Sequence, residues 1–205
     1  DIADLLVLHN RDIVNRIDDS VIRVVAGKPR VIRRARGFAP QSLALPAGFE
    51  KAEGILAFGA ELKSTFCMVK QGKAFLSQHQ GDLEDALTFD DYEHNVQLYT
   101  QLLQFDTQQL VCDLHPEYLS TKLAHEVAAG ASLTSFSNEL PLLSVQHHHA
   151  HIASALVENK LSLAHPKVLG IALDGLGMGD DNTFWGGEFL LADYQSATRV
   201  ARLAP

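Results

Sequence analysis

Four histidines crowd into five positions of the segment VQHHHAHIASALVE, which runs from residue 145 to 158. His147 and His151 stand four residues apart, so on a helix both rings project from one face, about one turn from each other. Two imidazoles placed in this way reach a single metal ion. His148 and His149 then point elsewhere, as hydrogen-bond donors to the ligands or as walls of a pocket. The alternative is a helix that begins with partly exposed histidines and binds no metal.

A carboxylate follows the next apolar strand. Asp174 ends the run VLGIALD, 23 residues beyond His151. At the carboxyl end of a strand, beside a histidine pair, it provides a third ligand of the kind found in sites that keep positions open for substrate. Two histidines and a carboxylate suit zinc and iron(II) alike, so the sequence predicts a divalent metal without choosing between them.

Two further segments offer candidate phosphate sites. GAELKSTF, residues 59 to 66, places Lys63 between two predicted strands, where its ammonium group acts as a point charge for a triphosphate; an ordinary polar turn is the alternative. Glycines after Asp174 let backbone N–H groups approach a phosphate closely, although the spacing matches neither the dinucleotide fingerprint nor the P-loop, and a flexible loop is the alternative. The glycines in these two segments are Gly59, Gly175, Gly177, Gly179, Gly186 and Gly187.

A fourth segment, CDLHPEYLST, places Asp113 and His115 after another predicted strand. Three separate strands thus present polar groups just past their carboxyl ends. Because ligands bind at that edge of an α/β sheet, we expect these groups to lie close together.

The elements that must position these residues come in a recognisable order. Three strands over residues 54–82 precede a helix over 85–105, whose apolar residues roughly keep the 3.6 period. Strands over 109–114, 141–146, 167–175 and 185–194 then alternate with helices over 115–129 and 148–161. This order predicts an α/β fold with a mixed sheet flanked by helices.

The first forty residues read as short strands over 5–10, 18–25 and 30–38, with a hairpin turn at AGKP. Residues 40–53 contain Pro40, Pro46 and Gly48, which are typical of a linker or domain boundary.

The bulk composition excludes several classes of function. The 205 residues are 46% hydrophobic and 20% charged, as expected for one sizeable core or two small ones. The net charge of -8 argues against nucleic-acid binding, although residues 23–36 hold six basic side chains and no carboxylate. No apolar run is long enough to span a membrane, and Cys67 and Cys112 form no CxxC pair, so we expect a cytoplasmic protein. The chain begins without Met and ends without a closing element, which suggests a fragment.

Taken together, VQHHHAHIASAL, ALDGLGMGDDNTFWGGEFL, LAFGAELKSTFC and CDLHPEYLST resemble the hydrogenase maturation carbamoyltransferase family HypF. RIDDSVIRVVAGKPRVIRRARGFAP resembles the end of that family's YrdC-like domain. The resemblance implies that residues 1–46 are the C-terminal part of a YrdC-like nucleotide-binding domain. Residues 53–205 would then be the N-terminal half of a carboxyl-terminal carbamoyltransferase domain with the actin-like ATPase fold, which is ribonuclease H-like.

The same resemblance implies an activity. Carbamoyl phosphate would be hydrolysed elsewhere in the protein, the carbamate would be joined to AMP from ATP, and the carbamoyl group would pass to the C-terminal cysteine of the partner HypE. The product is a precursor of the cyanide ligands of nickel–iron hydrogenase. By this resemblance His147, His151 and Asp174 match the family's metal ligands, and ATP would bring magnesium. Ser20, Arg34 and Arg36 would contact nucleotide phosphates, a solvated basic face being the alternative.

Relative to the family, most of the YrdC-like domain and the second half of the transferase site, with a further aspartate ligand, lie outside the sequence. If the 205 residues are the whole molecule, we expect an inactive protein. Three rival functions remain open: an O-carbamoyltransferase that acts on a small-molecule hydroxyl, a tRNA threonylcarbamoyl transferase, which the net acidity disfavours, and a truncated remnant that binds metal only structurally.

Overall fold

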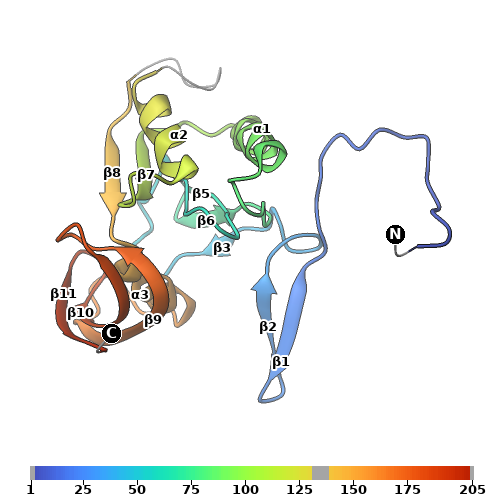
Figure 1. Ribbon diagram of the computed structural model, residues 1–205. Coiled ribbons are helices and arrows are strands. Elements are labelled where there is room, and N and C mark those ends of the chain that lie inside the picture. Colours follow the sequence, from blue (N-terminus) through green and yellow to red (C-terminus); the bar gives the residue numbers. More distant parts are fainter. Residues whose placement is uncertain (1–2, 131–138, 204–205) are drawn as a thin grey trace.

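A mixed six-stranded sheet forms the centre of the computed structural model, which describes residues 3–130 and 139–203 (Figure 1). Strands β4, β7 and β8 run parallel, and β5, β6 and β3 continue the sheet in antiparallel fashion from the other side of β4. The α/β prediction is therefore confirmed. In the order in which they lie side by side, the strands are β3 (Leu43–Ala44), β6 (Lys73–Leu76), β5 (Cys67–Lys70), β4 (Ile55–Ala57), β7 (Gln109–Asp113) and β8 (Leu142–Val145).

Helices α1 (Ala86–Leu102) and α2 (Leu119–Ala128) share one hydrophobic core with this sheet. The buried face of α1 is narrower than the apolar face that the 3.6-residue period predicts. Tyr92 and Val96 are fully buried, whereas Leu87 and Leu102 are exposed. The core is completed by strand residues such as Leu56, Met68 and Leu110 and by Leu123 and Val127 of α2.

A second, antiparallel sheet contains β9 (Val168–Met178), β10 (Phe184–Ala192) and β11 (Ala197–Arg202), with β10 in the middle. Helix α3 (His147–Glu158) packs on this sheet through Ile152 and Leu156. Gly170 of β9 permits the contact, because a Cβ there would lie 2.5 Å from Cδ1 of Ile152. Strand β11 was not predicted, although it follows β10 after a short turn and pairs with it antiparallel.

Near the N-terminus, the predicted hairpin is confirmed as β1 (Val21–Val25) and β2 (Lys28–Arg33). Its turn residues Ala26 and Gly27 both have positive φ, as a tight hairpin turn requires. Figure 1 shows the hairpin extending away from the six-stranded sheet. The predicted strand over 5–10 is wrong: Leu5, Leu6, Val7 and Leu8 are all more than 70% exposed and pair with no strand in the described part of the chain.

Residues 40–53, which we expected to be a linker, contribute β3 to the edge of the main sheet. The backbone N–H of Leu45 donates a hydrogen bond to the carbonyl of Gly72, and the N–H of Gly72 donates to the carbonyl of Ala52. These bonds connect residues 40–53 to the turn between β5 and β6. The division into a YrdC-like part to residue 46 and a transferase part from residue 53 stays a prediction. None of the helices in the described residues is both long and apolar enough to span a membrane.

Candidate functional site

The N-terminus of α3 is fixed to the second sheet by Gln146. Its side-chain oxygen caps the helix by accepting a hydrogen bond of 2.8 Å from the backbone N–H of His149. Its side-chain amide donates to the carbonyl of Met178 in β9, at 3.1 Å. Sequence reasoning missed this role, since glutamine is not among the residues preferred at a helix N-cap.

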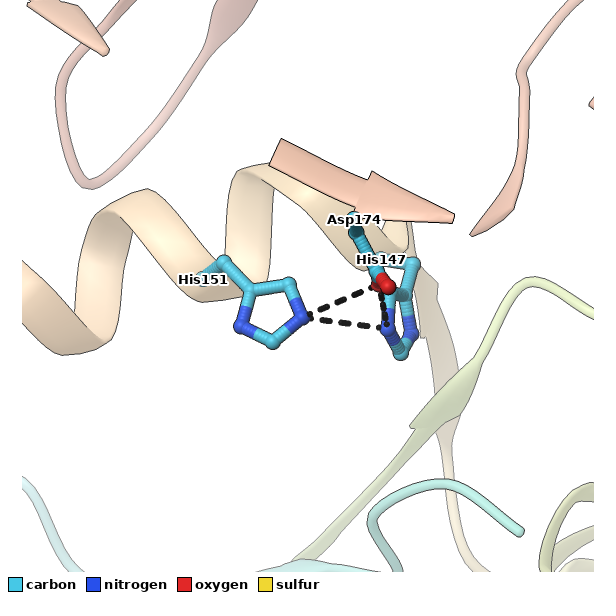
Figure 2. Close-up of side chains that lie close together, drawn as sticks. All are labelled: His147, His151 and Asp174. Atoms are coloured by element: carbon cyan, nitrogen blue, oxygen red, sulfur yellow. Dashed lines mark hydrogen bonds and ion pairs between the residues drawn. The ribbon is translucent and has the colours of Figure 1, made fainter. Parts of the chain in front are cut away.

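His147, His151 and Asp174 converge across this junction, as Figure 2 shows. The Nε2 atoms of the two histidines lie 3.2 Å apart. Oδ2 of Asp174 lies 2.9 Å from Nε2 of His147 and 3.3 Å from Nε2 of His151. The helix thus brings the two rings together, and the neighbouring strand brings the carboxylate.

These separations fit one shared cation. Two nitrogen or oxygen ligands in a tetrahedral zinc site, each bound at its usual distance, lie about 3.3 Å apart. Each of the three atoms is of a ligating type, and the His151 side chain is 54% exposed, so one side of the site is open to an incoming group. The residues present therefore fit a divalent metal held by two imidazoles and a carboxylate.

Asp113, the last residue of β7, orients the first ligand. Its Oδ2 lies 2.6 Å from Nδ1 of His147, which leaves Nε2 to face the candidate metal position. The Asp113 carboxylate is 8% exposed and also accepts from the backbone N–H of His115. Its hydrogen bond raises the pKa of His147, with a smaller contribution from Asp174, while burial of the ring acts in the opposite direction. A carboxylate on the far nitrogen of a ligating histidine fixes the ring and strengthens it as a ligand.

Asp174 does not end its strand, as the sequence suggested, but lies in the interior of β9. The ladder pairs Leu173 with Gly187 and Gly177 with Trp185, so three residues of β9 face the single Gly186 of β10. Such a bulge turns a side chain away from the direction that regular pairing gives it. Here the bulge carries the carboxylate to the histidines.

Cavities flank the three residues on two sides. One of about 260 Å³ is lined by Gly59, Cys112, Asp113, His147 and His151, among mostly apolar neighbours. Another of about 330 Å³ is lined by His151, Asp174 and apolar residues of α3 and β9. Of the GAELKSTF segment, Gly59 thus reaches the site, whereas Lys63 is exposed and does not line either cavity.

The glycines after Asp174 lie mostly in strands, as predicted for Gly175, Gly186 and Gly187. Gly175 and Gly177 belong to β9, Gly186 and Gly187 belong to β10, and Gly179 lies in the connection. Several of these glycines serve close packing: a Cβ on Gly177 would lie 2.5 Å from Cε1 of His148. Whether their backbone N–H groups bind a phosphate stays a prediction.

The other histidines that we expected beside the candidate ligands contact other groups. His148 is fully buried beneath β9, with Nδ1 3.0 Å from the amide of Gln146. His149 faces the carbonyl of Asp193 at 2.7 Å. His115 stacks on Tyr118, with ring centroids 4.2 Å apart.

Ser20, Arg34 and Arg36 lie in the N-terminal part and bond to its own backbone. The Ser20 hydroxyl donates to the carbonyl of Arg36 and accepts from the N–H of Ala35. The Arg34 guanidinium donates to two carbonyls, and that of Arg36 donates to the carbonyl of Ile17 and pairs with Asp19. They line neither of the two cavities beside the three candidate ligands, and their contact with a nucleotide stays a prediction.

Comparison with known families gives two matches along the chain. Residues 50–158 match the model described as the HypF Kae1-like domain. Residues 170–205 match the second subdomain of the carbamoyltransferase Kae1-like domain. The three candidate ligands are thus divided between the two matched segments.

Curated relatives cover the whole chain. The carbamoyltransferase HypF of Rhodobacter capsulatus is 44% identical over 203 residues, which are 99% of this chain and 26% of that protein. The probable carbamoyltransferase HypF of Methanocaldococcus jannaschii is 41% identical over 205 residues, or 98% of this chain and 25% of that protein. The chain therefore spans about a quarter of the length of these relatives.

Two solved structures are similar as well. A full-length HypF in the phosphate- and nucleotide-bound form matches with a TM-score of 0.81 and 45% identity, over 97% of this chain and 29% of that one. The HypF of T. kodakarensis matches with a TM-score of 0.77 and 41% identity, over 91% of this chain and 23% of that one. The family model covers more than half of the residues, and the fold agrees with these structures: the chain belongs to the HypF family, and its residues 50–158 match the Kae1-like domain of that family.

Proposed function

We propose that this chain supplies the metal-binding part of the active site in a HypF-type carbamoyltransferase. The observation that carries the proposal is the convergence of His147, His151 and Asp174, with Asp113 behind the first histidine. Family membership supports the reaction class, and the geometry supports the role of these four side chains.

In this proposal the substrates are carbamoyl phosphate and ATP. Hydrolysis of carbamoyl phosphate releases inorganic phosphate, and the remaining carbamate attacks the α-phosphorus of ATP, which gives carbamoyl-adenylate and pyrophosphate. The thiolate of the HypE C-terminal cysteine attacks the carbonyl carbon of the carbamoyl group, a C–S bond forms, and AMP leaves with the electrons of the broken C–O bond. A divalent cation, zinc or iron(II), would supply positive charge that polarises the carbonyl or neutralises the leaving phosphate.

The chain's own residues hold this site in place. Both Nε2 atoms and the Asp174 carboxylate would ligate the cation, and Asp113 would keep the His147 ring in the tautomer that ligates. The exposed side of His151 leaves room for substrate, and the neighbouring cavity of about 260 Å³ has mostly apolar walls. ATP and its magnesium would bind nearby.

The binding half of the proposal is tested by titration calorimetry on this chain with zinc, iron(II) and magnesium-ATP. We expect one divalent zinc or iron(II) per chain, and loss of that binding in a His147→Ala variant. The matched control is His165→Ala, which removes a partly exposed histidine whose Nδ1 lies 2.7 Å from the carbonyl oxygen of Pro166. Absence of zinc and iron(II) binding in the native chain would contradict the metal site.

The transfer half requires the rest of the protein. A chimera carries this chain in place of the matching 203 residues of the Rhodobacter capsulatus relative. It receives radiolabelled carbamoyl phosphate, ATP and either HypE or a small sugar. Label on HypE supports the proposal, and label on the sugar supports an O-carbamoyltransferase. Metal binding without transfer to either acceptor, in a folded chimera, would favour a structural metal site.

A further inference from the structure

Glu188 is a buried acid that the proposed reaction does not use. Its side chain is 2% exposed, in the middle of β10, and it lies among the apolar residues that face α3. A buried carboxylate is costly unless it is paired and hydrogen-bonded, so its partners show what it stabilises.

One partner is the backbone of Gly186. The Gly186 N–H donates to Oε1 of Glu188 at 3.2 Å. Gly186 is the single residue of β10 that faces the bulge of β9, and a Cβ built on it would lie 3.9 Å from the carbonyl oxygen of Asp174. The Glu188 carboxylate therefore satisfies a donor at the point where the regular ladder is interrupted.

The other partner is Arg199 of β11, which holds the carboxylate in a two-pronged ion pair. Its Nε and one terminal nitrogen lie 2.7 and 3.0 Å from the two oxygens of Glu188. The same guanidinium lies 4.5 Å above the ring of Trp185 and 3.5 Å from the carboxylate of Asp181. Arg199 thus restrains Trp185 directly and Gly186 through Glu188.

We propose that Glu188, oriented by Arg199, is a positioning residue for the candidate metal ligand Asp174, because it holds Gly186 in the conformation that the β9 bulge requires. The inference rests on the proposed metal site. Residues that support metal ligands from behind commonly change metal affinity by a factor of 10 to 100, about the size expected here.

The test measures cobalt(II) binding to the whole chain by absorption spectroscopy. We expect Glu188→Ala to weaken binding about tenfold and to change the visible bands at saturation. Glu188→Gln keeps an oxygen acceptor for the Gly186 N–H, so it should recover most of this affinity. The matched control is Asp193→Ala, which removes a carboxylate that caps the β10–β11 connection of the same sheet; its affinity should stay native.

A double-mutant comparison separates positioning from general loosening of the sheet. In an Asp174→Ala background, Glu188→Ala should cause no further loss of affinity, because the ligand on which it acts is gone. An equal loss in both backgrounds, native affinity in a folded Glu188→Ala variant, or equal losses in the alanine and glutamine variants would overturn the inference.

A second measurement tests the positioning role even if the native chain binds no metal or the alanine variant does not fold. Ring ¹⁵N shifts of His147 in the metal-free protein report its contact with the Asp174 carboxylate, 2.9 Å away in the native structure. We expect these shifts to change in Glu188→Ala, or in Arg199→Lys if the alanine variant unfolds. Unchanged shifts would overturn the positioning role. Absence of cobalt binding by the native chain would count against the metal site alone.

Discussion

Asp113 and His147 form a 2.6 Å contact although 34 residues separate them in the sequence. The contact follows from strand topology: β7 and β8 run parallel, with Asp113 paired to Val145 in register, so the acid and the first residues of α3 emerge at the same sheet edge. A buried carboxylate is thereby placed behind the imidazole, on the side away from Asp174.

Replacing this acid should weaken metal binding without unfolding the chain. Asp113→Asn keeps an oxygen that can accept from the His115 N–H but removes the charge beside His147 Nδ1. We expect zinc affinity to fall about tenfold in titration calorimetry. Asp106→Asn, at an exposed carboxylate, is the control and should bind zinc as the native chain does. Native affinity in Asp113→Asn would show that the contact has no influence on the ligand.

The last two histidines of the cluster, His149 and His151, allow a matched comparison within one helix. His151→Ala removes a candidate ligand, and we expect zinc affinity to fall by more than tenfold. His149→Ala removes a ring whose Nε2 faces the carbonyl of Asp193, so metal affinity should be retained with a loss of about 1 kcal/mol in unfolding free energy. Equal zinc affinities of the two variants would contradict the assignment of ligands.

Neighbouring glycines of β9 should differ in their tolerance of a methyl group. A Cβ on Gly177 would lie 2.5 Å from the buried His148 ring and 3.1 Å from Cβ of His147, so Gly177→Ala must push α3 away from the sheet. We expect it to cost about 1–3 kcal/mol in urea unfolding and to weaken zinc binding. A Cβ on Gly175 meets no heavy atom within 4 Å, so Gly175→Ala should change stability by less than about 0.5 kcal/mol. Similar stabilities of the two variants would contradict this packing.

Glu61 should give the chain an unusual response to acid. Its carboxylate accepts from the backbone N–H of Leu119 at the start of α2, where Tyr118 makes no side-chain cap. Burial raises the pKa of Glu61 despite its bonds to that backbone, so the folded state disfavours the ionised form. The native chain therefore gains stability from this group as pH falls through the raised value.

We expect Glu61→Gln, which keeps an acceptor oxygen, to match or exceed the native unfolding free energy at pH 7. As the pH is lowered to about 4, the unfolding free energy of the native chain should rise relative to that of Glu61→Gln. Glu61→Ala loses the cap and should cost about 1 kcal/mol at pH 7 and more at pH 4, where the native carboxyl group adds its stabilisation. Urea unfolding at a series of pH values measures all three, and a pH-independent difference between native and glutamine forms would contradict the raised pKa.

The element order and the histidine pair were accessible from sequence because they depend on local periodicity. The spacing of His147 and His151 determines their shared face wherever a helix forms, and parallel strands bring Asp113 to the same edge. The apolar strand that precedes Asp174 suggested the third ligand, and the resemblance to the family matched the same three residues.

Features that depend on tertiary contacts were not predictable. The bulge that carries Asp174 arises from the register between two strands, which a single sequence does not specify. Gln146 acts as a cap only because Met178 of β9 lies beside it. Residues 5–10 have the composition of a strand, yet a strand needs a neighbour with which to pair, and none lies beside them in the described structure.

The division of the ligands between two matched segments has an evolutionary consequence. His147 and His151 lie in residues 50–158 and Asp174 in residues 170–205. Neither segment contains all three candidate ligands, so recombination that separated the segments would dismantle the candidate cation site in both descendants. A cation site of this kind persists in a lineage only when the two segments are inherited together.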